Sequence, residues 1–64
     1  MKYKIDSTAS DKVLCISERG IIRLKRTRQG LIIADAEFFP LREVELLILC
    51  LDANPFLKEL DFSF

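Results

Sequence analysis

The sequence predicts a small α+β protein, in which an antiparallel meander of three to four strands packs on one long helix in the C-terminal half. Short apolar runs with interspersed polar residues fill the first half of the chain, and alternation of this kind is typical of strands. Glycines close two of the turns between these runs. Residues 41–53 instead repeat apolar side chains at helical spacing. With 64 residues, the chain is expected to form a single domain over residues 1–64.

The helix predicted over residues 41–53 is the segment around which the fold is organised. Its apolar stripe consists of Leu41, Val44, Leu47, Ile48 and Leu51. Pro40 suits the first turn, where its missing N–H matters little. Pro55 ends the helix because it disfavours helical geometry at Asn54. A buried strand over residues 46–51 is the alternative, disfavoured because the segment is long and poor in β-branched residues.

Four strands are predicted before the helix, at residues 2–5, 12–17, 21–26 and 31–34. The third has a basic outer face, because its isoleucine and leucine alternate with arginine and lysine. The fourth is apolar on both faces, so we expect it to be central in the sheet or covered.

The tail over residues 56–64 allows two interpretations. Leu60, Phe62 and Phe64 alternate with polar residues, which suits a strand. Phe56, Leu57 and Leu60 would equally suit one helical turn. In either case the tail is expected to pack on the core or on a neighbouring subunit, since an aromatic terminus frays unless it is docked.

Half of the residues are hydrophobic, which is more than one small core hides easily. A homodimer would cover the excess, and its predicted interface consists of Leu46, Leu49, Cys50, Phe62 and Phe64. The alternative is a monomer with an ordinary partly apolar surface.

Charge is distributed unevenly along a chain whose formal net charge is zero. Residues 1–34 hold eight basic and three acidic side chains, whereas residues 35–64 hold two basic and seven acidic ones. The strongest chemical feature is the basic cluster of Arg23, Lys25, Arg26 and Arg28. Three interpretations apply: a solvated strand face, a contact surface for a protein partner, or a phosphate-binding hairpin at residues 19–30. The nearest aromatic that could stack on a base is Tyr3.

Catalysis is not expected, because the chain has no histidine and no nucleophile motif. Glu43 and Glu45 lie off the apolar stripe on different sides of the helix, and the acidic residues follow no metal-binding pattern. We therefore predict no catalytic residue, no metal, no cofactor and no small-molecule substrate. Cys15 and Cys50 are expected to be buried, reduced thiols.

The N-terminus lacks the apolar stretch of a signal peptide, and the apolar run at residues 46–51 is too short to cross a bilayer. A cytoplasmic location is therefore expected, in a cell or in the host of a virus. Together these features predict a non-enzymatic interaction module, a regulator or inhibitor that acts as a homodimer by binding another protein. The alternative function is binding of single-stranded DNA or RNA through the basic hairpin.

Overall fold

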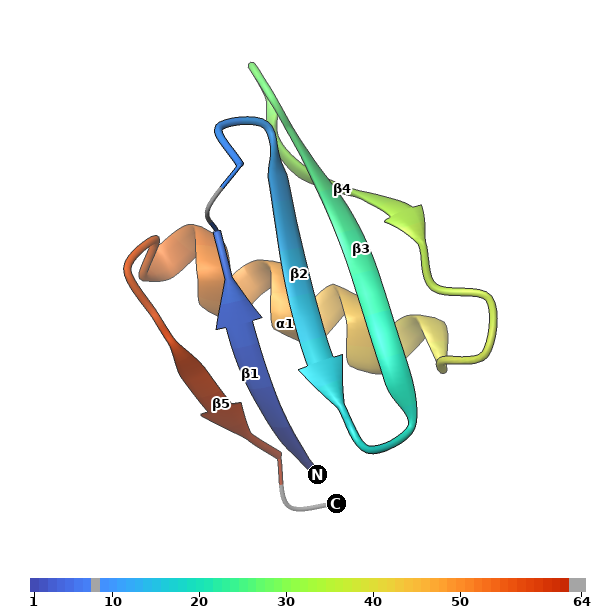
Figure 1. Ribbon diagram of the computed structural model, residues 1–64. Coiled ribbons are helices and arrows are strands. Elements are labelled where there is room, and N and C mark those ends of the chain that lie inside the picture. The colour runs from blue at the N-terminus through green and yellow to red at the C-terminus, as the bar shows by residue number, and fades with distance from the viewer. Residues whose placement is uncertain (8, 63–64) are drawn as a thin grey trace.

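Four strands run back and forth as an antiparallel meander, and one helix then crosses a face of the sheet (Figure 1). The computed structural model describes residues 1–7 and 9–62. Its elements in chain order are β1 (Lys2–Asp6), β2 (Lys12–Ser17), β3 (Gly20–Thr27), β4 (Gly30–Asp35), α1 (Leu41–Ala53) and β5 (Glu59–Asp61). The strand order across the sheet is β4-β3-β2-β1-β5. The α+β class and the helix over residues 41–53 are therefore confirmed.

The tail supplies a fifth strand, which lies beside the first strand at one edge of the sheet (Figure 1). Tyr3 on β1 lies opposite Leu60 on β5. Backbone hydrogen bonds extend this pairing on both sides, from the Ile5 N–H to the Lys58 carbonyl and from the Phe62 N–H to the Met1 carbonyl, each 2.8 Å long. Of the two interpretations of the tail, the strand is confirmed, and the sheet has one strand more than the largest number predicted.

Both ends of α1 follow from local backbone chemistry. The Pro40 carbonyl accepts hydrogen bonds from the N–H groups of Glu43 at 3.1 Å and Val44 at 3.2 Å, which starts the helix. At the other end the Asn54 N–H donates to the Cys50 carbonyl at 3.0 Å. Pro55 cannot continue this series of bonds, so the chain turns away towards β5. Among the described residues, no helix is both long and apolar enough to span a membrane.

The core lies between α1 and one face of the sheet. Its buried apolar residues are Tyr3, Val13, Cys15, Ile22, Leu24, Leu31, Val44, Leu47 and Leu51. Three residues of the predicted helical stripe are among them, and Ile48 is half-buried beside them. Leu41 does not follow the prediction, since 61% of its surface is exposed. It is the first residue of the helix, and the stripe is buried only from Val44 onwards.

The prediction that residues 31–34 form a central or covered strand is wrong within a single chain. β4 is an edge strand, and the adjacent isoleucines Ile32 and Ile33 are 48% and 39% exposed. An apolar pattern on both faces of a strand is typical of burial, but it does not reveal whether the covering surface comes from the same chain. β4 therefore presents exposed apolar side chains at the margin of the sheet.

Candidate functional site

The sheet has two unlike faces, because α1 covers only one of them (Figure 1). Directly opposite residues in antiparallel strands point to the same face, and the next pair along points to the other. Cys15 and Ile22 form one such pair and are fully buried under the helix. The pairs on either side of it point away from α1. We call the sheet surface that faces away from α1 the open face.

Basic and aliphatic side chains predominate on the central strands of the open face. From β1, β2 and β3 it receives Lys2, Lys4, Asp6, Lys12, Leu14, Ile16, Ile21, Arg23 and Lys25. At the far edge β5 adds Glu59 and Asp61, which lie opposite Lys4 and Lys2. β4 adds Ile32 opposite Lys25. Ile16 is 36% exposed, Ile21 is 37% exposed, and they lie opposite each other. A partner that matches this surface needs anionic groups next to apolar ones.

Three of the basic residues on the open face have acidic neighbours, and Lys4 is one of them because it lies directly opposite Glu59. The Arg23 guanidinium donates to the Asp35 carboxylate at 3.2 Å, and the Lys2 ammonium lies 3.8 Å from the Glu59 carboxylate. Both pairs are well exposed, so each contributes little to stability. In the part of the chain that the structure describes, no ion pair includes Lys4, Lys12 or Lys25.

Lys12 and Lys25 lie directly opposite each other on neighbouring strands of the open face. Like charges in this position repel each other and lower the stability of a sheet. Ile32 continues the same row across β4. The row therefore combines two adjacent positive charges with an exposed aliphatic side chain, and an anion placed over it would relieve the repulsion.

The predicted basic cluster is divided by the fold. Arg23 and Lys25 lie on the open face, whereas Arg26 lies opposite Leu31 on the side of the sheet that faces α1. Arg28 lies in the turn between β3 and β4. Sequence analysis missed Lys12 because its charge joins that of Lys25 only through the pairing of the strands. Residues 12–17 show no regular alternation of polar and apolar side chains, so the segment itself gave no signal that Lys12 lies beside Lys25.

The residues predicted for a dimer interface do not form one exposed patch. Leu49 is 65% exposed on the helix, whereas Leu46 and Cys50 are half-buried. Phe62 is half-buried in its own chain, where its ring lies edge-on to the Tyr3 ring with 6.2 Å between the centroids. Phe64 lies outside the described residues.

A buried polar pair connects the first strand to the helix. The Tyr3 hydroxyl donates a hydrogen bond to Glu43 Oε1 at 2.7 Å, and Glu43 is only 7% exposed. Burial raises the pKa of Tyr3 far above its usual value, and the hydrogen bond to Glu43 raises this pKa further. Glu43 lies off the apolar stripe as predicted but not in solvent, because the tyrosine satisfies its carboxylate. The pair fixes the start of α1 over β1, and it occupies the tyrosine that could have stacked on a base.

The two cysteines are free thiols in different surroundings. Cys15 is fully buried, and burial raises its pKa from 9.0 to about 11. At about pH 8 we expect Ellman's reagent to modify half-buried Cys50 in the native protein. It should modify Cys15 only after denaturation, because burial disfavours the reactive thiolate form of Cys15. A Cys50→Ser variant provides the control with Cys15 alone. Equal rates of modification for both thiols in the native protein would contradict this prediction.

The same pKa shift predicts a loss of stability at alkaline pH. Above pH 9.0 the unfolded chain releases the Cys15 proton, whereas the folded chain retains it up to a pKa of about 11. The stabilisation is therefore complete below pH 9.0 and is lost as the pH rises to about 11, by roughly 2–3 kcal/mol. Urea denaturation at increasing pH measures the change, and a Cys15→Val variant should lose less stability over this interval.

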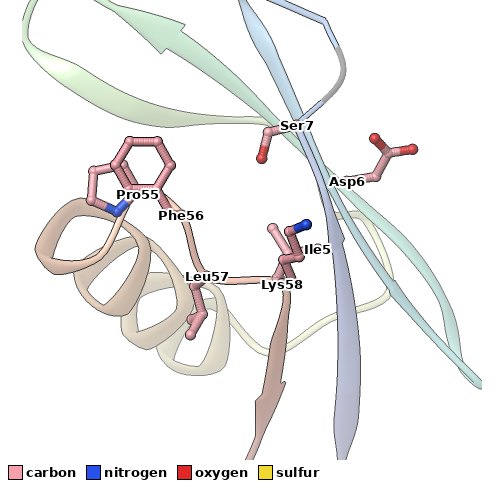
Figure 2. Close-up of a pocket in the computed structure, with 7 residues that line it drawn as sticks. All are labelled: Ile5, Asp6, Ser7, Pro55, Phe56, Leu57 and Lys58. Atoms are coloured by element: carbon pink, nitrogen blue, oxygen red, sulfur yellow. The ribbon is translucent and has the colours of Figure 1, made fainter.

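A shallow hollow lies where β1 ends and the chain leaves α1 for β5 (Figure 2). Its apolar wall is made by Ile5, Pro55, Phe56 and Leu57. Figure 2 shows the Asp6 carboxylate directed away from Pro55 and Phe56. Since its polar groups do not converge, the hollow lacks the arrangement that orients a substrate. Within residues 1–7 and 9–62, no group of three or more acidic or cysteine side chains could hold a metal ion.

The geometry thus defines a small α+β domain with one covered and one open sheet face. Comparison of the chain with protein-family models, with curated proteins and with solved structures finds no match. The open face and the apolar edge at β4 are therefore interpreted from their own chemistry.

Proposed function

We propose that this protein is a non-enzymatic interaction module that self-associates and binds an acidic segment of a protein partner on its open face. By covering that segment it would act as a regulator or inhibitor. The observation that carries the proposal is the Lys12–Lys25 pair, whose like charges lie side by side next to Ile32. Such a pair lowers the stability of the free protein and gains favourable energy only when an anionic group is bound.

The chemistry of the open face favours a protein over a nucleic acid. Ile16, Ile21 and Ile32 offer exposed aliphatic surface, which suits leucine or valine side chains of a peptide. Stacking on bases requires an aromatic ring, and Tyr3 is fully buried on the other face of the sheet. The exposed ring of Phe38 lies in a hollow that Asp35 and Glu37 also line, and their carboxylates would repel a phosphate backbone. Binding of single-stranded DNA or RNA is therefore an alternative outcome of the test, based on phosphate contacts alone.

The test uses a fluorescent peptide of alternating aspartate and leucine, with an oligothymidylate of similar charge as the competing probe. We expect the peptide to bind, and its affinity to fall by roughly tenfold or more in a Lys12→Glu/Lys25→Glu variant. Fluorescence anisotropy measures the affinity at several salt concentrations. Circular dichroism checks that the variant is folded, which is expected because both lysines are exposed.

An Arg42→Glu/Lys58→Glu variant is the matched control, because it makes the same change of charge away from the row of lysines. It should retain most of the peptide affinity. An equal loss in both variants would show that net charge rather than the open face governs binding. Tight binding of the oligonucleotide, falling steeply with salt, together with no binding of the peptide would favour the nucleic-acid alternative.

A further inference from the structure

We propose that the occupant of the exposed β4 edge is a second copy of this chain, paired antiparallel with β4 about a two-fold axis at Ile32. This inference rests on the proposed function in that it specifies how the module self-associates. It differs from a dimer formed through the outer side of α1. The resulting dimer joins the two five-stranded sheets into one and places both helices on the same side.

The outward backbone groups of β4 can be identified from the hydrogen bonds of β3. The Arg26 N–H donates to the Asp11 carbonyl at 2.7 Å, so the backbone of Arg26 faces β2 rather than β4. Backbone groups alternate along a strand, so Lys25 faces β4 and bonds with Ile32 opposite it. Leu31 and Ile33 must then direct their N–H and C=O groups outward, away from β3.

These outward groups define a register for the second copy. With Ile32 on the two-fold axis, Leu31 of each chain lies opposite Ile33 of the other, and each exchanges N–H and C=O with its opposite residue. A β-bulge interrupts the β3–β4 pairing next to Leu24. The register uses the outward groups of β4 that lie between the β3–β4 turn and this bulge. The bulge leaves Ala34 as the extra residue, so the new ladder is short and ends there.

Side chains and charges at this edge suit a copy of the same strand. Charged side chains and prolines normally protect an edge strand from pairing with another chain. Residues 31–34 contain neither. The start of β4 follows Arg28, whereas its end carries Asp35 and is followed by Glu37. Antiparallel pairing brings the basic end of each copy to the acidic end of the other. A parallel arrangement would place like charges together.

The dimer also extends the open face that we propose for partner binding. Ile32 lies on the open face, so the row of Lys12, Lys25 and Ile32 in one chain would continue into Ile32, Lys25 and Lys12 of the second copy. Two lysine pairs would then flank a central aliphatic strip. An acidic segment that crosses the axis could contact both pairs at once, which increases its affinity.

Charge changes at Ile32 test this arrangement, because the residue would face its own copy across the axis. We expect sedimentation equilibrium to give twice the 7.4 kDa chain mass for the natural protein. Ile32→Glu and Ile32→Lys should each sediment with the mass of one chain, and an equimolar mixture of the two should recover the dimer. Ile32→Glu remains compatible with the monomer fold, since Lys25 lies opposite it within the chain.

Two further variants make the outcome decisive. Ile33→Pro removes an outward N–H that has no hydrogen bond to the residues that the structure describes, so the variant should fold and lose the dimer. Leu49→Lys adds charge to the exposed side of the helix and should remain dimeric. The proposal is overturned if the natural protein has the mass of one chain, if Ile33→Pro folds and stays dimeric, or if Leu49→Lys alone becomes monomeric.

Failure of this proposal can be distinguished from failure of the proposed function. The side chain of Ile33 does not lie on the open face, so Ile33→Pro should still bind the acidic peptide, with lower affinity because the second set of lysines is lost. If dimerisation fails while Lys12→Glu/Lys25→Glu still abolishes peptide binding, the binding function stands without the edge dimer. If the natural protein is dimeric and does not bind the peptide, the edge dimer stands and the proposed binding function fails.

Discussion

A Leu47→Ala variant is expected to lose about 2–5 kcal/mol of unfolding free energy, the largest effect of any single substitution considered for this protein. Leu47 is fully buried at the centre of the contact between α1 and the sheet. Truncation removes its apolar contacts and leaves a cavity that the rigid sheet cannot close. A single core of this size rarely supplies more than about 3–5 kcal/mol, so the variant should be largely unfolded at room temperature.

Urea denaturation followed by circular dichroism measures this loss, with Leu49→Ala as the matched control on the same helix. Leu49 is 65% exposed, so its truncation should change the unfolding free energy by no more than about 0.5 kcal/mol. Losses of similar size at the two positions would show that α1 is covered on both sides, as a dimer through the outer side of the helix requires. Both variants are compared at the same protein concentration, since association itself stabilises the fold.

The second large effect is expected at the buried pair of Tyr3 and Glu43. Tyr3→Phe should lower the unfolding free energy by about 1–3 kcal/mol, because the Glu43 carboxylate stays buried without its donor. Glu43→Leu should also be destabilising, because it leaves the Tyr3 hydroxyl without its acceptor. The double variant Tyr3→Phe/Glu43→Leu should lose less unfolding free energy than the sum of the losses in the two single variants.

Thermal and urea denaturation of the four proteins in this cycle give the coupling free energy. A coupling of about 1 kcal/mol or more supports a hydrogen bond that matters to the fold. Strictly additive losses would instead indicate that the hydroxyl and the carboxylate are each solvated independently. The cycle is best measured near neutral pH, well below the raised pKa of Tyr3.

Local sequence patterns were sufficient to predict most of the secondary structure. Residues 41–53 have a long helical period and a proline beyond each end, so the helix could be placed correctly. Of the strands before it, residues 2–5 and 22–25 alternate basic with apolar or aromatic side chains. All four strands are separated by a polar loop or by turns that end in glycine. β5 is only three residues long, so its pairing with β1 could not be decided from its own pattern.

Features that depend on pairing between distant residues could not be predicted in this way. Glu43 meets Tyr3 across 40 positions, and nothing near either residue indicates the contact. Lys12 joins Lys25 only when β2 and β3 are in register. The position of β4 at the edge is a property of the whole sheet, and a two-faced apolar strand looks the same whether its own chain or a second copy covers it.

We propose, as the central claim, that a second copy pairs with the exposed edge of β4. The open face of the joined sheets then binds an acidic partner. Amide hydrogen exchange at Leu31 and Ile33 tests it most directly, because their N–H groups point outward in a single chain. Glu59 and Asp61 provide an internal control at the other edge, since the bond from Phe62 to Met1 shows that they also face outward.

We predict that protection at Leu31 and Ile33, measured by NMR, rises with protein concentration, while exchange at Glu59 and Asp61 stays fast throughout. Exchange at Leu31 and Ile33 as fast as at Glu59 and Asp61, at every concentration, would contradict the account.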